Sequence, residues 1–136
     1  MARPKDIGTA AETAVVKALR VHGFPHAERR ALAGTYDLGD IVGTVGIVWE
    51  VKGGEAAKSA SDGQIEKWLE ETERERLNAN AEYGVLVVQR KGIGAPNAHR
   101  WWAILAEQHY TTRWYLEDIC YWLRAQGYGT PLEDAA

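Results

Sequence analysis

The segment that most constrains the fold is residues 83–89, which is almost continuously apolar and contains three valines. A strand with one face in water alternates polar and apolar side chains, because successive side chains point to opposite faces. This segment does not alternate, which is typical of a strand covered on both faces. It therefore predicts a sheet with residues 83–89 in its interior.

Helical spacing of apolar residues and capping signals predict three helices. The first begins at a capping box formed by Thr9 and Glu12 and ends at Gly23. The second begins at Ser61 or Asp62 and reaches about residue 78, after a loop of small residues. The third begins at Thr111 or Thr112 and ends near residue 126.

Further strands are expected within 24–30, at 40–43 and 47–52, and at 101–105, with a basic loop over 90–100. The order α-β-β-β-α-β-β-α predicts an α/β fold, with a mixed β-sheet flanked by helices. The chain of 136 residues is expected to form one domain, with 130–136 as a frayed tail.

The net charge of −3 does not exclude nucleic acid as a partner. Residues 62–82 carry seven acidic and three basic side chains, and the other 115 residues sum to +1. A solvated acidic helix would account for the whole deficit. The single cysteine, Cys120, allows no disulfide within the chain and is expected in the core. Without a leader or a long apolar segment, the expectation is a cytoplasmic protein with no membrane partner.

The pattern that points to chemistry lies in residues 40–52. Glu50 and Lys52 share one face of the expected strand, which by itself fits an exposed face with an ion pair. A three-residue loop over 44–46 would, however, pair Asp40 with Glu50 across a hairpin. Two carboxylates opposed at about 4.5–5.5 Å between Cβ atoms destabilise a sheet unless a cation joins them. In this register Asp37 falls on the other face, so Asp40 is the predicted ligand.

An Asp, a hairpin and then Glu-x-Lys resemble the PD-(D/E)XK nuclease superfamily, and its Holliday junction resolvase-like members most of all. The resemblance covers residues 8 to about 90 and includes Glu12, Gly23-Phe24 and Arg29. Gly39 stands where the superfamily's name has Pro. The resemblance implies a restriction-endonuclease-like fold.

It also implies a mechanism. Asp40, Glu50 and the Val51 carbonyl would hold Mg²⁺ or Mn²⁺, which acidifies a bound water and neutralises charge on the scissile phosphate. Lys52 would orient that water and stabilise the transition state. The products would carry 5′-phosphate and 3′-hydroxyl ends. Glu12 has two interpretations that do not exclude each other, a helix cap and a supporting residue of the metal site.

Several residues are candidates for binding DNA. Of Trp101 and Trp102 at most one can stack on bases, since neighbours on a strand face opposite ways. The aromatic last helix, with Trp114, Tyr115, Tyr121 and Trp122, is a candidate homodimer interface. The DNA-binding candidates are Arg29, Arg30, Lys58, Gln64, Arg90, Lys91 and Arg100.

The first functional hypothesis is a homodimeric, structure-selective DNA endonuclease that cuts four-way junctions. The second is a restriction-like or repair nuclease that acts on linear DNA. The third is a non-catalytic nucleic-acid- or protein-binding module with the same fold. Intact Asp40, Glu50 and Lys52 argue against the third hypothesis.

Overall fold

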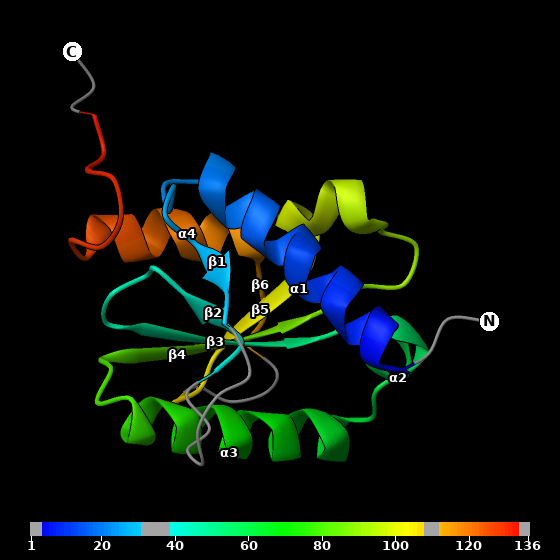
Figure 1. Ribbon diagram of the computed structural model, residues 1–136. Helices are drawn as coiled ribbons and strands as arrows, with labels where there is room; N and C mark the ends of the chain where they lie inside the picture. Colours follow the sequence, from blue (N-terminus) through cyan, green and yellow to red (C-terminus); the bar gives the residue numbers. More distant parts are fainter. Residues whose placement is uncertain (1–3, 31–38, 108–111, 134–136) are drawn as a thin grey trace.

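The computed structural model describes residues 4–30, 39–107 and 112–133. Its centre is a four-stranded mixed sheet with helices on both faces, as the sequence predicted. In Figure 1, α1 (Pro4–Val21) and α4 (Leu116–Ala125) lie on one side of the sheet and α3 (Asp62–Asn78) lies on the other. No helix in the described part of the chain is both long and apolar enough to cross a membrane.

The strand order is β3-β4-β5-β6. The strand β3 (Ile47–Lys52) runs parallel to β4 (Tyr83–Val88), and α3 forms the crossover between them. The strands β5 (Trp102–Leu105) and β6 (Trp114–Tyr115) complete the sheet in antiparallel pairs. The apolar segment 83–89 is therefore an interior strand, and its prediction is confirmed.

Each face of β4 belongs to a separate core. Val85 and Val87 pack in the larger core with residues of α1 and α4. Leu86 and Val88 pack in a smaller core under α3. Because Glu50 is paired with Leu86 and Lys52 with Val88, both charged side chains of β3 lie on the face that α3 covers.

The predicted start of the first helix is wrong. The helix α1 begins at Pro4, so Thr9 and Glu12 lie inside it and form no capping box. Proline suits a helix's first turn, where its missing N–H costs nothing. The predicted end is right, since the helix stops at Val21 and Gly23 has a φ of 101°.

The predicted hairpin is only partly right. The short strand β2 (Ile41–Val42) forms its ladder with β1 (Glu28–Arg29) and not with β3. Gly43, with a φ of 86°, permits the pairing with β1, since a Cβ there would lie 1.9 Å from the carbonyl oxygen of His26. The tight turn before β3 is closed by the bond from Ile47 N–H to Thr44 O at 3.0 Å.

Other differences lie at element ends. The expected loop 53–61 contains a short helix, α2 (Gly54–Lys58), and the basic loop contains a 3₁₀ helix, η1 (Ala95–Arg100). The helix α4 starts at Leu116, later than predicted, because residues 114–115 form β6; Thr111 lies outside the described residues. The prediction for α3 is confirmed, with the Ser61 hydroxyl accepting the Gln64 N–H.

Candidate active site

Asp40 is held against the middle of β3 by two hydrogen bonds. Its backbone N–H donates to Trp49 O at 2.8 Å, and its Oδ2 accepts the N–H of Val51 at 2.8 Å. The Val51 N–H, which in a regular hairpin would donate to a backbone carbonyl of the neighbouring strand, thus donates to the Asp40 side chain instead. The expected proximity of Asp40 to Glu50 is present, although the regular ladder pair is not.

Glu50 is buried, with only 6% of its surface exposed. The exposed-strand explanation for Glu-x-Lys is therefore wrong. Burial raises the pKa of Glu50 to about 12, and hydrogen bonding and the negative charges of Glu75 and Asp40 add to the shift. On the opposite face, Trp49 is fully buried and its Nε1–H donates to Thr44 Oγ1 at 3.0 Å. This anchor fixes the orientation of β3 and hence of Glu50.

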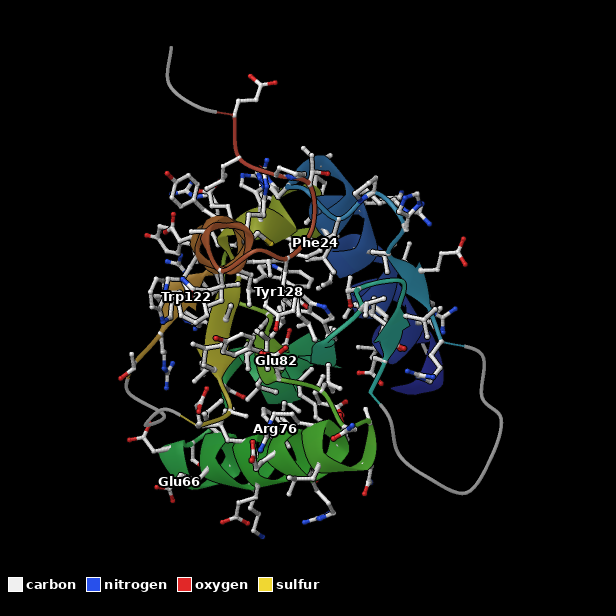
Figure 2. The ribbon with its side chains drawn as sticks, turned by 90° about the vertical axis from the view of Figure 1, so that its left-hand side faces the viewer. Phe24, Glu66, Arg76, Glu82, Trp122 and Tyr128 are labelled. Atoms are coloured by element: carbon white, nitrogen blue, oxygen red, sulfur yellow. The ribbon has the colours of Figure 1, made fainter. Side chains whose placement is uncertain are left out.

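Glu75 is a member of the site that the sequence reasoning missed. The prediction of a solvated acidic helix places Glu75 in water, whereas its side chain is 1% exposed and raises the pKa of Glu50. The signal was available, because Glu75 lies three residues after buried Thr72 and so continues the buried stripe of α3. In Figure 2, Glu66 points away from the sheet while Arg76 points toward it. The side chains of α3 therefore lie in different environments, and an acidic residue of this helix can be either solvated or buried.

Lys52 lies between β3 and α3. Its Nζ is 3.8 Å from Glu50 Oε1 and 3.4 Å from Glu71 Oε2, and it lies over the ring of Trp68 at 5.6 Å. Burial lowers the pKa of Lys52, but the charges of Glu50 and Glu71 outweigh burial and the net pKa is raised. The ammonium group is therefore charged at neutral pH and directed toward the carboxylates.

Glu12 approaches Asp40 from α1. Burial raises the pKa of Glu12 and the charge of Asp40 raises it further, while Arg29, 3.7 Å away, acts in the opposite direction. The capping interpretation of Glu12 is wrong, and the supporting role stays a prediction. Arg29 also donates to Thr9 Oγ1 at 3.4 Å.

Four carboxyl groups from α1, the segment before β2, β3 and α3 thus influence one another; we call Glu12, Asp40, Glu50 and Glu75 the carboxylate cluster. Their oxygens are the donors that Mg²⁺ and Mn²⁺ prefer, so the donor chemistry fits a hard divalent cation. Over 4–30, 39–107 and 112–133, however, no three His, Cys, Asp or Glu side chains are arranged to hold a metal. Asp40 in particular directs Oδ2 to Val51 N–H.

The DNA-binding candidates lie in three parts of the structure. Arg29 and Arg30 lie beside the cluster, and Arg30 donates to Gly39 O at 3.1 Å. Gln64 lies in the first turn of α3. The others, Lys58, Arg90, Lys91 and Arg100, lie toward the far strands of the sheet or on α2, and three of them (Lys58, Arg90 and Lys91) line one cavity.

The aromatic side chains near α4 are used largely within the chain. Trp122 packs edge-on against Tyr83 at 5.2 Å between ring centroids and lies 6.4 Å from Trp114. Only Tyr121 of the four is highly exposed, at 63%. Two of the aromatic residues proposed for the homodimer interface, Trp114 of β6 and Trp122 of α4, are therefore partly covered within the chain. The homodimer stays a prediction.

Comparisons with protein-family models, curated proteins and solved structures give no match for this chain. Membership of the nuclease superfamily therefore remains a resemblance carried by the residues described above.

Proposed function

We propose that this protein is a metal-dependent endonuclease that hydrolyses DNA phosphodiesters, with Asp40, Glu50 and Lys52 at its active site. The observation that carries the proposal is the burial of Glu50 between two further carboxyl groups, with the Lys52 ammonium 3.8 Å away. Strongly perturbed titratable groups gathered in one place are typical of functional sites.

A purely structural role explains the carboxylate cluster poorly. A buried carboxylate is costly unless it is paired, and adjacent carboxylates raise the cost because they repel one another. An apolar side chain at position 50 would fill the same space next to Leu86 without this penalty. Retaining the acids is reasonable if they serve to bind a cation.

The architecture supports the same proposal. The resemblance implied a mixed sheet flanked by helices, an Asp before one strand and Glu-x-Lys on the next. The chain has β3 and β4 parallel through α3, with Asp40 hydrogen-bonded beside Glu50. We infer a restriction-endonuclease-like fold from this arrangement.

In the proposed reaction, Asp40, Glu50 and the Val51 carbonyl would hold Mg²⁺ or Mn²⁺. The bound cation would supply Lewis acidity and lower the pKa of its water. Lys52 donates hydrogen bonds to the attacking water and to the phosphate oxygens, where charge develops in the transition state. Its contact with Glu71 keeps the ammonium charged and must exchange for the phosphate when substrate binds.

We further propose branched DNA, a four-way junction above all, as the substrate of a homodimer. A restriction-like or repair nuclease on linear DNA is the alternative. A non-catalytic nucleic-acid-binding module with the same fold is the third candidate, and the presence of Asp40, Glu50 and Lys52 argues against it.

A cleavage assay tests these proposals directly. Junction, flap, linear duplex and single-stranded DNA are incubated with the protein in Mg²⁺, Mn²⁺ or EDTA. We expect metal-dependent cleavage that is fastest on the junction and is lost in Glu50→Gln. Lys67→Ala, on the exposed side of α3, is the matched control and should cleave normally. No cleavage of any substrate by the folded protein in either metal would overturn the nuclease proposal.

A further inference from the structure

Arginine and aromatic side chains gather away from the carboxylate cluster, on and beside β5 and β6. We call Arg90, Arg100, Arg113, Trp102 and Tyr115 the arginine–aromatic patch. The Arg90 guanidinium lies 4.3 Å from the Trp102 ring centroid and 5.2 Å from that of Tyr115. Arg100 lies 5.9 Å from Tyr115, and Arg113 lies 6.0 Å from Trp102.

The sheet itself builds the aromatic part of this patch. Trp102 and Tyr115 are directly paired across β5 and β6, so their side chains share a face. Their ring centroids are 5.8 Å apart, with 29° between the ring planes. Trp101, by contrast, points into the core with 1% exposure, which fits the prediction that only one of the two tryptophans can stack on bases.

The patch lies in the same row of the sheet as Lys52. In adjacent strands of the sheet, Lys52 is paired with Val88, Val88 with Trp102, and Trp102 with Tyr115. Two strand spacings separate the backbones of Lys52 and Trp102, which is about 10 Å. A nucleic-acid strand bound at Trp102 therefore lies near the proposed site of cleavage, although Val88 between them is buried under α2 and α3.

A cavity of about 180 Å³ opens beside Trp102. Its walls include Lys58, Arg90, Lys91 and Arg113. A space of this volume has room for a single base or a phosphate group and not for a base pair. It therefore favours an unpaired strand, whose bases are free to stack on aromatic rings and guanidinium planes.

Several cationic side chains in and beside the patch have no carboxylate partner among the described residues, which favours the binding of an anion. Arg113 lies 3.7 Å from Asp62, and Lys58 lies 3.3 Å from Glu55. Arg90, Lys91 and Arg100 form no ion pair with the part of the chain that the structure describes; Arg90 donates to Arg100 O instead. Beside the two rings, the charge of Arg113 is offset by Asp62, whereas the cations of Arg90, Lys91 and Arg100 favour the binding of phosphate groups.

We propose that the arginine–aromatic patch binds an unpaired segment of a nucleic-acid strand. Bases stack on Trp102, Tyr115 and the guanidinium plane of Arg90, and phosphates pair with Arg100, Lys91 and Arg113. The binding itself is independent of the metal site. In one respect the inference rests on the proposed function: a strand held here makes a four-way junction with an unpaired arm beside the cut a better substrate than the fully paired junction.

Binding is tested by fluorescence anisotropy in EDTA, so that no cleavage occurs. The probes are labelled oligothymidylate and oligouridylate of about twelve nucleotides, within the usual site size for such proteins, and a hairpin duplex of equal charge. We expect the single strands to bind more tightly than the duplex. The Arg90→Gln/Arg100→Gln variant should weaken single-strand binding about tenfold or more and reduce the salt dependence of binding.

Because Trp102 is half-buried, a large change there could unfold the protein. The aromatic residues are therefore tested with Trp102→Phe and Tyr115→Leu, and thermal melting shows whether each variant is folded. Trp102→Phe keeps a ring and should retain more binding than Tyr115→Leu; Lys67→Ala should bind as the unchanged protein does. Unchanged single-strand affinity in the folded double arginine variant would overturn the inference, as would equal losses for duplex and single strand. The DNA and RNA probes show which strand the patch prefers.

The outcomes separate this inference from the nuclease proposal. If Glu50→Gln loses cleavage but binds the single strand normally, both stand. If the double arginine variant still cleaves a fully paired substrate but no longer prefers one with an unpaired arm, the link between patch and cut is supported. If the unchanged protein cleaves no substrate but the patch variants still lose single-strand binding, only the nuclease proposal fails.

Discussion

The backbone N–H of Val51 donates a 2.8 Å hydrogen bond to the carboxylate of Asp40. Val51 lies between Glu50 and Lys52, so this bond fixes Asp40 beside both residues of the Glu-x-Lys pair. The same bond uses an oxygen that the proposed metal site needs, and so it links the stability of this edge of the sheet to the occupancy of the site.

The first prediction separates the two roles of Asp40. Asp40→Asn keeps a side-chain oxygen that can accept the Val51 N–H, so the fold should be retained while cleavage is lost. Asp40→Ala leaves that N–H without its acceptor, which costs about 1–3 kcal/mol where the group is buried. In urea unfolding with EDTA present, the free energy of unfolding should therefore be higher for Asp40→Asn than for Asp40→Ala. Full cleavage by Asp40→Asn in saturating Mg²⁺ would exclude Asp40 from the site.

The second prediction concerns the pH dependence of stability without metal. The pKa of Glu50 is raised in the folded state, so its contribution to folding is complete below its unfolded pKa, about 4.3, and declines as pH rises toward about 12. The free energy of unfolding in EDTA should fall between about pH 5 and pH 9, and Glu50→Gln should flatten that slope. Parallel slopes for the two proteins would mean that Glu50 titrates normally.

The third prediction tests Glu75, which lies on the buried side of α3. Glu75→Gln removes a neighbouring negative charge, so the pKa of Glu50 should fall and the metal-free protein should become more stable at neutral pH. If Glu75 positions the site, the pH profile of cleavage should shift as well, which a merely structural role would not cause. Glu66→Gln, on the outer side of the same helix, is the control and should change neither quantity.

The fourth prediction concerns Lys52. Lys52→Ala should reduce kcat by about 100- to 1,000-fold, as the loss of one transition-state hydrogen-bond donor does elsewhere. Metal affinity, followed by calorimetry, should change little, because the ammonium group binds no cation. Glu71→Gln releases the competing contact at 3.4 Å and should leave Lys52 active. A kcat unaffected by Lys52→Ala would remove the lysine from the mechanism.

Local pattern predicted most of the elements and the proximity of Asp40 to Glu50, whereas close tertiary contacts decided the rest. The apolar run of β4 and the cap at Ser61 act through neighbours in sequence, so the interior strand and α3 could be predicted. The pairing of β2 with β1 depends on the contact between Gly43 and His26, far apart in the chain, which no periodicity reveals. Glu75 was missed because its charge was given more weight than its place on the buried stripe.

The last prediction concerns assembly and substrate. Trp114 and Trp122 pack within the chain, so a dimer interface on α4 has Tyr121 as its main exposed aromatic side chain. Tyr121→Asp should therefore convert a dimer into a monomer in light scattering while leaving thermal stability unchanged. If the homodimer cuts junctions, this variant should lose paired cuts on a four-way junction but retain single cuts. Junction binding should also weaken steeply with salt, because phosphate contacts dominate such affinities. A protein that is monomeric before the substitution, with equal affinity for junction and linear duplex, would instead support the restriction-like or repair alternative.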